Sequence, residues 1–78
     1  MNVKDKLQTM LKKADELIND SPEEALKLYT NAKELASTKK DILSLASITK
    51  GICHYYFLKE DFERSDTIFT EAIDILLK

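Results

Sequence analysis

Cys53 and His54 are the residues in which nucleophilic chemistry would first be sought, because the chain holds one cysteine and one histidine. A thiolate activated by an imidazole needs the two side chains within hydrogen-bonding reach. Neighbouring positions of a helix point about 100° apart. If this segment is helical, the pair fails as nucleophile and base, and Cys53 is better explained as a small residue of the core.

The sequence supports metal binding and acid–base catalysis no better than it supports a cysteine nucleophile. A zinc site needs several ligands, and one cysteine with one histidine is too few. The 14 acidic residues are spread along the chain without a second type of partner, and with one glycine there is no glycine-rich loop. We therefore expect no enzyme: no catalytic residue, no metal and no cofactor.

The composition indicates a globular, helical chain. Apolar residues make up 44% and charged residues 33%, a balance too apolar for a disordered protein. One glycine and one proline are too few for the frequent turns of a β-sheet. The formal net charge is −2 and no run of Lys or Arg exceeds two residues, so nucleic acid is not an expected partner.

The sequence also gives no sign of a membrane segment. No apolar run approaches the roughly 18 residues of a membrane span, and the first residues lack the apolar centre of a signal peptide. A single cysteine cannot form an internal disulfide, which is typical of a reducing compartment. We therefore expect a cytoplasmic protein with no membrane partner.

Apolar residues recur every three or four positions over four stretches of similar length, which predicts four amphipathic helices. The first is expected over about 3–19, the second from Pro22 to about Ala36, the third over about 41–58 and the fourth over 62–77. Ser21 is expected to cap the second helix with its hydroxyl. Pro22 fits the first helical position, and the side chain of Glu24 can bond back to the Ser21 amide.

The third helix is the most apolar of the four. Apolar side chains cover most of its circumference, and such a helix is expected to be central and buried. Thr38 and Asp41 resemble a weak capping box near its start. Asp61 follows a short polar connection and can cap the fourth helix.

The sequence repeats itself at a shift of 40 residues, which superimposes the second helix on the fourth. Tyr29 then meets Phe69, and each ring has a small residue four positions before it and three after it. The first and third helices match at a shift of 39. The chain therefore reads as one domain, 1–78, of two helical hairpins at about 3–37 and 40–78, with Tyr29 and Phe69 buried in equivalent places. Any two amphipathic helices share a helical period, which is the alternative explanation of the match.

These positions resemble the tetratricopeptide repeat over nearly the whole chain. The second hairpin matches the family's small and aromatic positions in Cys53, Tyr56, Phe62, Ser65, Phe69 and Ala72, and the first in Ala14, Ala25, Tyr29 and Ala32. The match is incomplete, because Glu60 stands where the family usually has a glycine and the period exceeds the common value of about 34. The three-helix MIT domain, also a peptide-binding module, is an alternative resemblance.

The resemblance implies a protein–protein interaction or scaffold module that binds a peptide or partner segment in a groove lined by the first helix of each hairpin. Carried over position by position, the groove residues are Gln8, Lys12, Asp15, Ser47, Lys50, His54 and Phe57. Lys50 and His54 are four apart and so share a helix face. Some members of the family grip a C-terminal carboxylate with Lys and Asn at that spacing. Alternatively, Lys50 and His54 are simply part of a solvent-exposed helix face without a binding role.

The fourth helix suggests a second possible function. Its apolar residues fill an arc of roughly 200°, wider than a terminal helix needs, with Ile68 and Ile75 at the edge. A homodimer that associates through this helix is therefore the alternative function. A further helix in the natural protein, or simple surface exposure, would also explain the arc.

Overall fold

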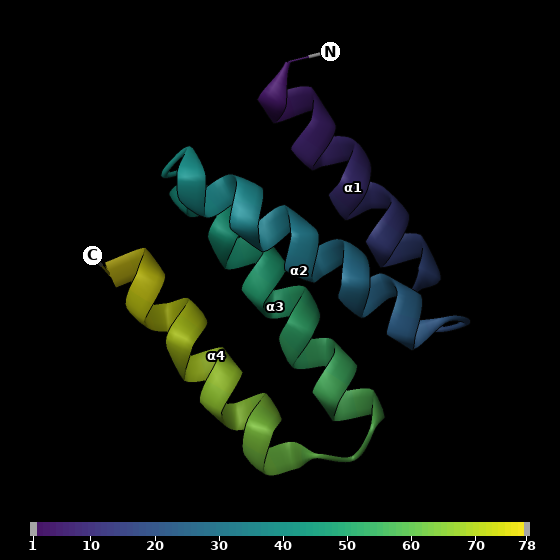
Figure 1. Ribbon diagram of the computed structural model, residues 1–78. Helices are drawn as coiled ribbons and strands as arrows, with labels where there is room; N and C mark the ends of the chain where they lie inside the picture. The colour runs from purple at the N-terminus through teal and green to yellow at the C-terminus, as the bar shows by residue number, and fades with distance from the viewer. Residues whose placement is uncertain (1, 78) are drawn as a thin grey trace.

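The computed structural model describes residues 2–77, which form four α-helices and no strand (Figure 1). The helices are α1 (Val3–Leu17), α2 (Pro22–Thr38), α3 (Ile42–Leu58) and α4 (Phe62–Leu77). The predicted fold class, four antiparallel helices in two tandem hairpins, is confirmed. Four helices are one more than an MIT domain would have. Residues 1 and 78, the expected ends of the domain, lie outside the described part.

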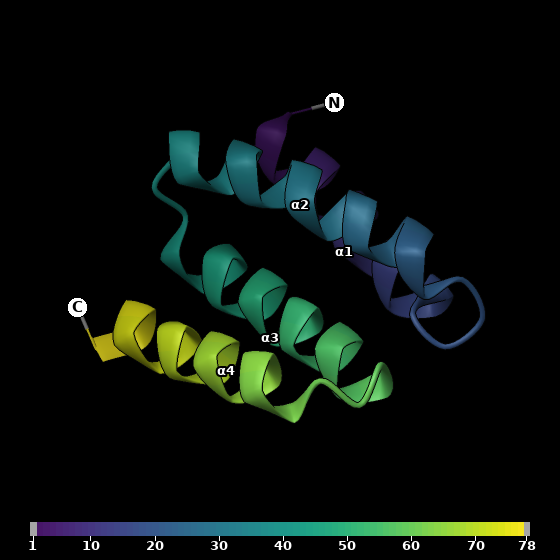
Figure 2. The ribbon, with the colours of Figure 1, turned by 60° about the horizontal axis from the view of Figure 1, so that its bottom comes forward.

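The central helix is α3. It packs against both α2 and α4, whereas α1 packs on α2 and contacts α3 only slightly. Figures 1 and 2 show from two directions that α1 and α4 are the outer helices. The Cα positions extend over 36 × 31 × 14 Å, so the molecule is a thin slab in which each helix keeps an exposed face. The prediction that α3 is central is therefore right, but the prediction that this helix is buried is right only in part, because Leu43 is 75% exposed and Phe57 55%.

Tyr29 is the largest of the fully buried side chains, at 1% exposure. Its ring lies against the backbone of α3 at Gly51, where an added Cβ would come within 2.3 Å of the ring Cζ. A side chain at position 51 would therefore occupy the space that the ring fills. The only glycine of the chain stands where α2 and α3 need a residue without a side chain.

The prediction for the equivalent ring, Phe69, is wrong. Phe69 is 53% exposed, although the small residues around both rings are buried as the repeat requires. These small residues are Ala25, Ala32, Ser65 and Ala72. Tyr29 is covered because α3 packs across α2, whereas among residues 2–77 no helix packs across the corresponding face of α4.

Cys53 and Ser65 are the small residues at which α3 approaches α4. The Sγ atom of Cys53 lies 3.1 Å from both the carbonyl and the hydroxyl oxygen of Ser65. The Ser65 hydroxyl in turn donates to the carbonyl of Cys53 at 3.1 Å. The thiol is therefore part of the packing between these two helices, as the sequence predicts for a small residue.

The turns before α3 and α4 share one backbone geometry. Lys40 and Glu60 have φ values of 54° and 61°, in the left-handed region. The N–H groups of the next residues, Asp41 and Asp61, donate to carbonyls five residues earlier at 3.0 and 2.9 Å, the long bond of a Schellman motif. Their carboxylates accept from N–H groups three residues later at 3.1 and 3.2 Å. Each turn thus ends one helix and caps the next within three residues.

Two of the predicted caps are wrong. α2 does begin at Pro22, but the Ser21 side chain makes no capping hydrogen bond. The Ser21 N–H donates to the carbonyl of Leu17 at 2.7 Å, so it is not left for Glu24. Thr38 belongs to the end of α2, where its hydroxyl donates to the carbonyl four residues earlier at 3.0 Å.

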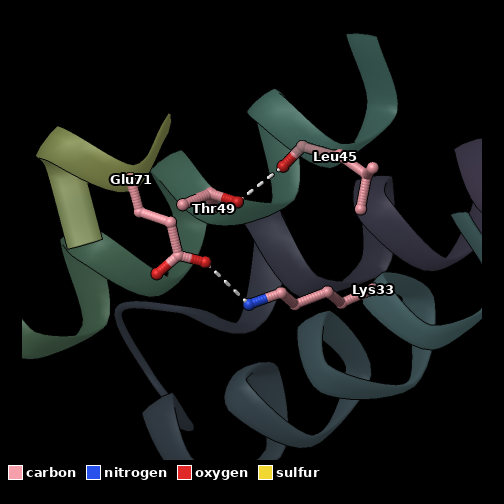
Figure 3. A network of polar contacts seen from close by, with 4 residues as sticks. All are labelled: Lys33, Leu45, Thr49 and Glu71. Carbon is pink, nitrogen blue, oxygen red and sulfur yellow. Dashed lines mark hydrogen bonds and ion pairs between the residues drawn. The ribbon is translucent and has the colours of Figure 1, made fainter. Parts of the chain in front are cut away.

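An ion pair joins α2 to α4 across α3. The Nζ atom of Lys33 lies 3.1 Å from Oε1 of Glu71, and Figure 3 shows the pair beside Thr49 of α3. Thr49 is fully buried, and its hydroxyl donates to the carbonyl of Leu45 at 2.7 Å. The charged side chains stay 38% and 44% exposed, so solvent screens the pair and its contribution to stability is at most about 1 kcal/mol.

Gly51→Ala should lower the free energy of unfolding by about 1–3 kcal/mol, because the new Cβ meets a ring that is too buried to swing away. Helix propensity alone predicts the opposite, a gain of about 1 kcal/mol. Urea unfolding followed by circular dichroism measures the difference. Ser47→Ala, one turn earlier on α3, is the control and should be close to neutral. In the double variant Tyr29→Leu, Gly51→Ala, the loss should be smaller than the sum of the single losses.

Lys40→Gly and Glu60→Gly should each raise the free energy of unfolding by about 0.5–1 kcal/mol. A left-handed residue with a Cβ costs about 1–2 kcal/mol, which the greater flexibility of glycine in the unfolded chain offsets in part. Lys39→Gly is the matched control, because its φ of −93° gives glycine no advantage there. Equal responses at positions 39 and 40 would contradict the strain at Lys40.

Candidate binding site

A groove of about 370 Å³ lies where α1, α2 and α3 meet. Its lining comes from three parts of the sequence: Asp15 of α1 with Ile18 directly after that helix, Tyr29 of α2, and Ser47, Lys50, Gly51 and His54 of α3. Helical spacing explains the α3 set, because positions 47, 50, 51 and 54 recur at intervals of three and four. The groove is open enough for a side chain or a chain terminus to enter.

Of the seven predicted groove residues, the structure brings four together here: Asp15, Ser47, Lys50 and His54. Gln8 and Lys12 lie apart from them, in a separate shallow depression on α1. Phe57 lies beside the groove instead of lining it. Its ring stacks on His54 with 6.4 Å between centroids, and meets the ring of Phe62 edge-on at 5.6 Å.

Sequence reasoning missed three residues of the groove: Ile18, Tyr29 and Gly51. Tyr29 was expected in the core, and its ring belongs to the core and also forms the floor of the groove. Gly51 carried a signal, because a glycine inside a helical pattern costs about 1 kcal/mol relative to alanine and therefore stands out. No local pattern could have shown which ring approaches it.

Asp15 and Tyr29 are joined at the bottom of the groove. The Tyr29 hydroxyl donates a hydrogen bond to Oδ1 of Asp15. Burial of the ring, then this hydrogen bond, and then the carboxylate charge raise the pKa of Tyr29 above its ordinary value of 10.0. Tyr29 therefore stays a neutral donor, and the Asp15 carboxylate is held by a partner inside the fold.

Lys50 and His54 are exposed at the rim. Among residues 2–77, no acidic side chain lies within ion-pair distance of Lys50. The ammonium group therefore forms no ion pair within the described part of the fold. The arrangement can accept an anionic group from outside, with the imidazole one helical turn away as a second polar contact.

A second groove, of about 470 Å³, runs between α3 and α4. It is lined by Leu43, Ala46, Ser47 and Lys50 of α3 and by Phe69, Ala72, Ile73 and Leu76 of α4. The walls are largely apolar. Ser47 and Lys50 line both grooves, because they lie on the ridge of α3 that separates them.

The two predicted self-association residues, Ile68 and Ile75, are half-buried, and Ile68 packs against the core. The exposed large apolar side chains of α4 lie on another face. They are Phe62, Phe69, Ile73, Leu76 and Leu77. Any association through α4 would therefore use that face more readily than the edge that carries the two isoleucines.

Within residues 2–77, no three His, Cys, Asp or Glu side chains come close enough together to hold a metal ion. None of the four helices in this range combines the length and the apolar character that a membrane crossing requires.

Comparison with known proteins found no match for the chain among protein-family profiles, curated proteins or solved structures.

The raised pKa of Tyr29 predicts a loss of stability in alkali. The unfolded chain releases the tyrosine proton near pH 10, whereas the folded chain still holds it, so the free energy of unfolding falls as pH rises above about 10. The Tyr29→Phe variant has no hydroxyl proton at this position and therefore lacks this loss of stability with pH. Urea unfolding at neutral pH and at about pH 11 should show the stability difference between wild type and Tyr29→Phe shrinking at the higher pH. Tyr55→Phe is the control, and a difference unchanged by pH would contradict the role of the buried hydroxyl.

Proposed function

We propose that this chain is a protein–protein interaction module that binds a peptide or partner segment in the groove between α1 and α3. The observation that carries the proposal is the convergence of Asp15, Ser47, Lys50 and His54 on one groove from helices far apart in the sequence. The resemblance of the two hairpins to tetratricopeptide repeats, whose groove is lined by the same helices, points in the same direction.

The chemistry of the groove favours an anionic group of the partner, such as an acidic side chain or a C-terminal carboxylate. The Asp15 carboxylate accepts a hydrogen bond from the Tyr29 hydroxyl, whereas the Lys50 ammonium forms no ion pair with an acidic side chain among the described residues. The exposed ring of Phe57, stacked on His54, offers an apolar contact for the residue next to that anion.

Binding is a better explanation than catalysis for the few reactive side chains. The thiol of Cys53 is engaged with Ser65 between α3 and α4, and the ring of His54 stacks on Phe57. Neither residue has the other as a hydrogen-bond partner. The single cysteine also favours a reducing, cytoplasmic setting for the module.

The proposal is tested with a library of immobilised peptides, each made with a free C-terminal carboxylate and as an amidated twin. Selected peptides are then measured in solution by fluorescence anisotropy. Lys50→Ala with His54→Ala removes the two rim groups, and Lys27→Ala with Asn31→Ala is the matched control. The control pair has a lysine and a polar residue four apart on the exposed face of α2.

Binding should weaken at least about tenfold in the Lys50, His54 double variant, which corresponds to about 1.4 kcal/mol, and hardly at all in the control. It should also weaken as salt concentration rises, because the attraction to an exposed ammonium is screened. A double variant that keeps its helicity and binds the same peptides at full strength would exclude this groove.

A further inference from the structure

The exposed face of α4 carries the spacing of a helix–helix interface. Phe62, Asp66, Phe69, Ile73 and Leu76 follow one another at intervals of four, three, four and three, the alternation of the a and d positions of a heptad repeat. The four apolar members are 57%, 53%, 41% and 56% exposed. A stripe of this kind, with each member half uncovered, is suited to pairing with another helix.

The exposed area of the chain agrees with a missing contact. Its accessible surface is 5476 Å², whereas a compact monomer of 9.0 kDa is expected to expose about 4,900 Å². The chain thus exposes roughly 600 Å² more than a compact monomer of its mass. The groove between α3 and α4 lies beside the stripe and can receive a helix along its length.

Charge identifies the helix that fits. Asp66 is the one charged residue within the stripe, and Lys50 lines the same groove as Phe69 and Ile73. If two α4 helices pair antiparallel about the point midway between positions 69 and 70, position 73 of one copy faces position 66 of the other. Asp66 of each copy then enters the groove that Lys50 of the other copy lines, so the pair holds two such contacts. A parallel arrangement would bring the two Asp66 carboxylates together, and the repulsion between these like charges disfavours it.

We propose that two copies of this chain associate about a twofold axis, each laying α4 antiparallel into the α3–α4 groove of the other. The same surface patch serves on both sides, as a closed dimer requires. The interface joins the apolar stripe of α4 to the apolar groove walls, and the two Lys50–Asp66 contacts between copies fix its direction.

The test is sedimentation equilibrium of the purified chain from micromolar to millimolar concentration, with charge-reversed variants. Lys50→Glu and Asp66→Lys should each raise the dimer dissociation constant about tenfold or more, because each places two pairs of like charges in contact. The double variant Lys50→Glu, Asp66→Lys should recover most of the affinity. The controls are Lys27→Glu and Asp20→Lys, which reverse charges on exposed residues away from α3 and α4 and should leave the dissociation constant unchanged.

Circular dichroism checks that every variant keeps its helices, and Ile73→Lys provides a second route to the monomer through the apolar part of the interface. A wild-type chain that remains monomeric at millimolar concentration overturns the proposal and leaves the groove to a helix of another chain. A dimer that Ile73→Lys leaves intact shows that the copies meet elsewhere. If Ile73→Lys dissociates the dimer but the double variant Lys50→Glu, Asp66→Lys does not recover the affinity that the single variants lose, the antiparallel register is wrong.

Discussion

The contact between the Tyr29 ring and the Gly51 backbone is the constraint on which the arrangement of the helices depends. The ring comes from α2, the space for it exists only because α3 has no side chain at that point, and the ring hydroxyl reaches Asp15 on α1. One side chain therefore connects three helices. It also closes the bottom of the groove in which we place the binding site, so packing and recognition share the same atoms.

The two turns after α2 and α3 set the direction of the helix that follows each of them. Each turn ends a helix with a left-handed residue and begins the next helix with an aspartate cap, without any spare residue between them. Turns this short leave the following helix antiparallel and adjacent to the previous one. The fold accepts the strain of Lys40 and Glu60 in positions that suit glycine, which shows that tertiary packing outweighs the local preference.

The number of helices, and their bounds to within two residues, could be predicted from the sequence, because both follow from local periodicity. Burial could be predicted only where a neighbour exists to supply it: Tyr29 and Phe69 occupy matching positions, yet only Tyr29 is covered, by α3. The predicted Asp61 cap is present, whereas the predicted Ser21 cap is absent, because the Ser21 hydroxyl can cap only if the backbone at that residue aims it correctly. The groove was partly predictable, because Ser47, Lys50 and His54 share a helix face, whereas Ile18 joins them only through the packing of α1.

The position of Lys50 links the two proposed surfaces. Its side chain lines both the groove between α1 and α3 and the groove between α3 and α4. A single ammonium group on a flexible stem can neutralise a peptide carboxylate on one side or the Asp66 of a second copy on the other, and each of these contacts weakens the other. Because such coupling is reciprocal, a peptide that draws Lys50 into the first groove would loosen the dimer by the same factor by which the dimer weakens peptide binding. The ridge of α3 that carries Lys50 and Ser47 is then the element through which self-association and partner binding oppose each other.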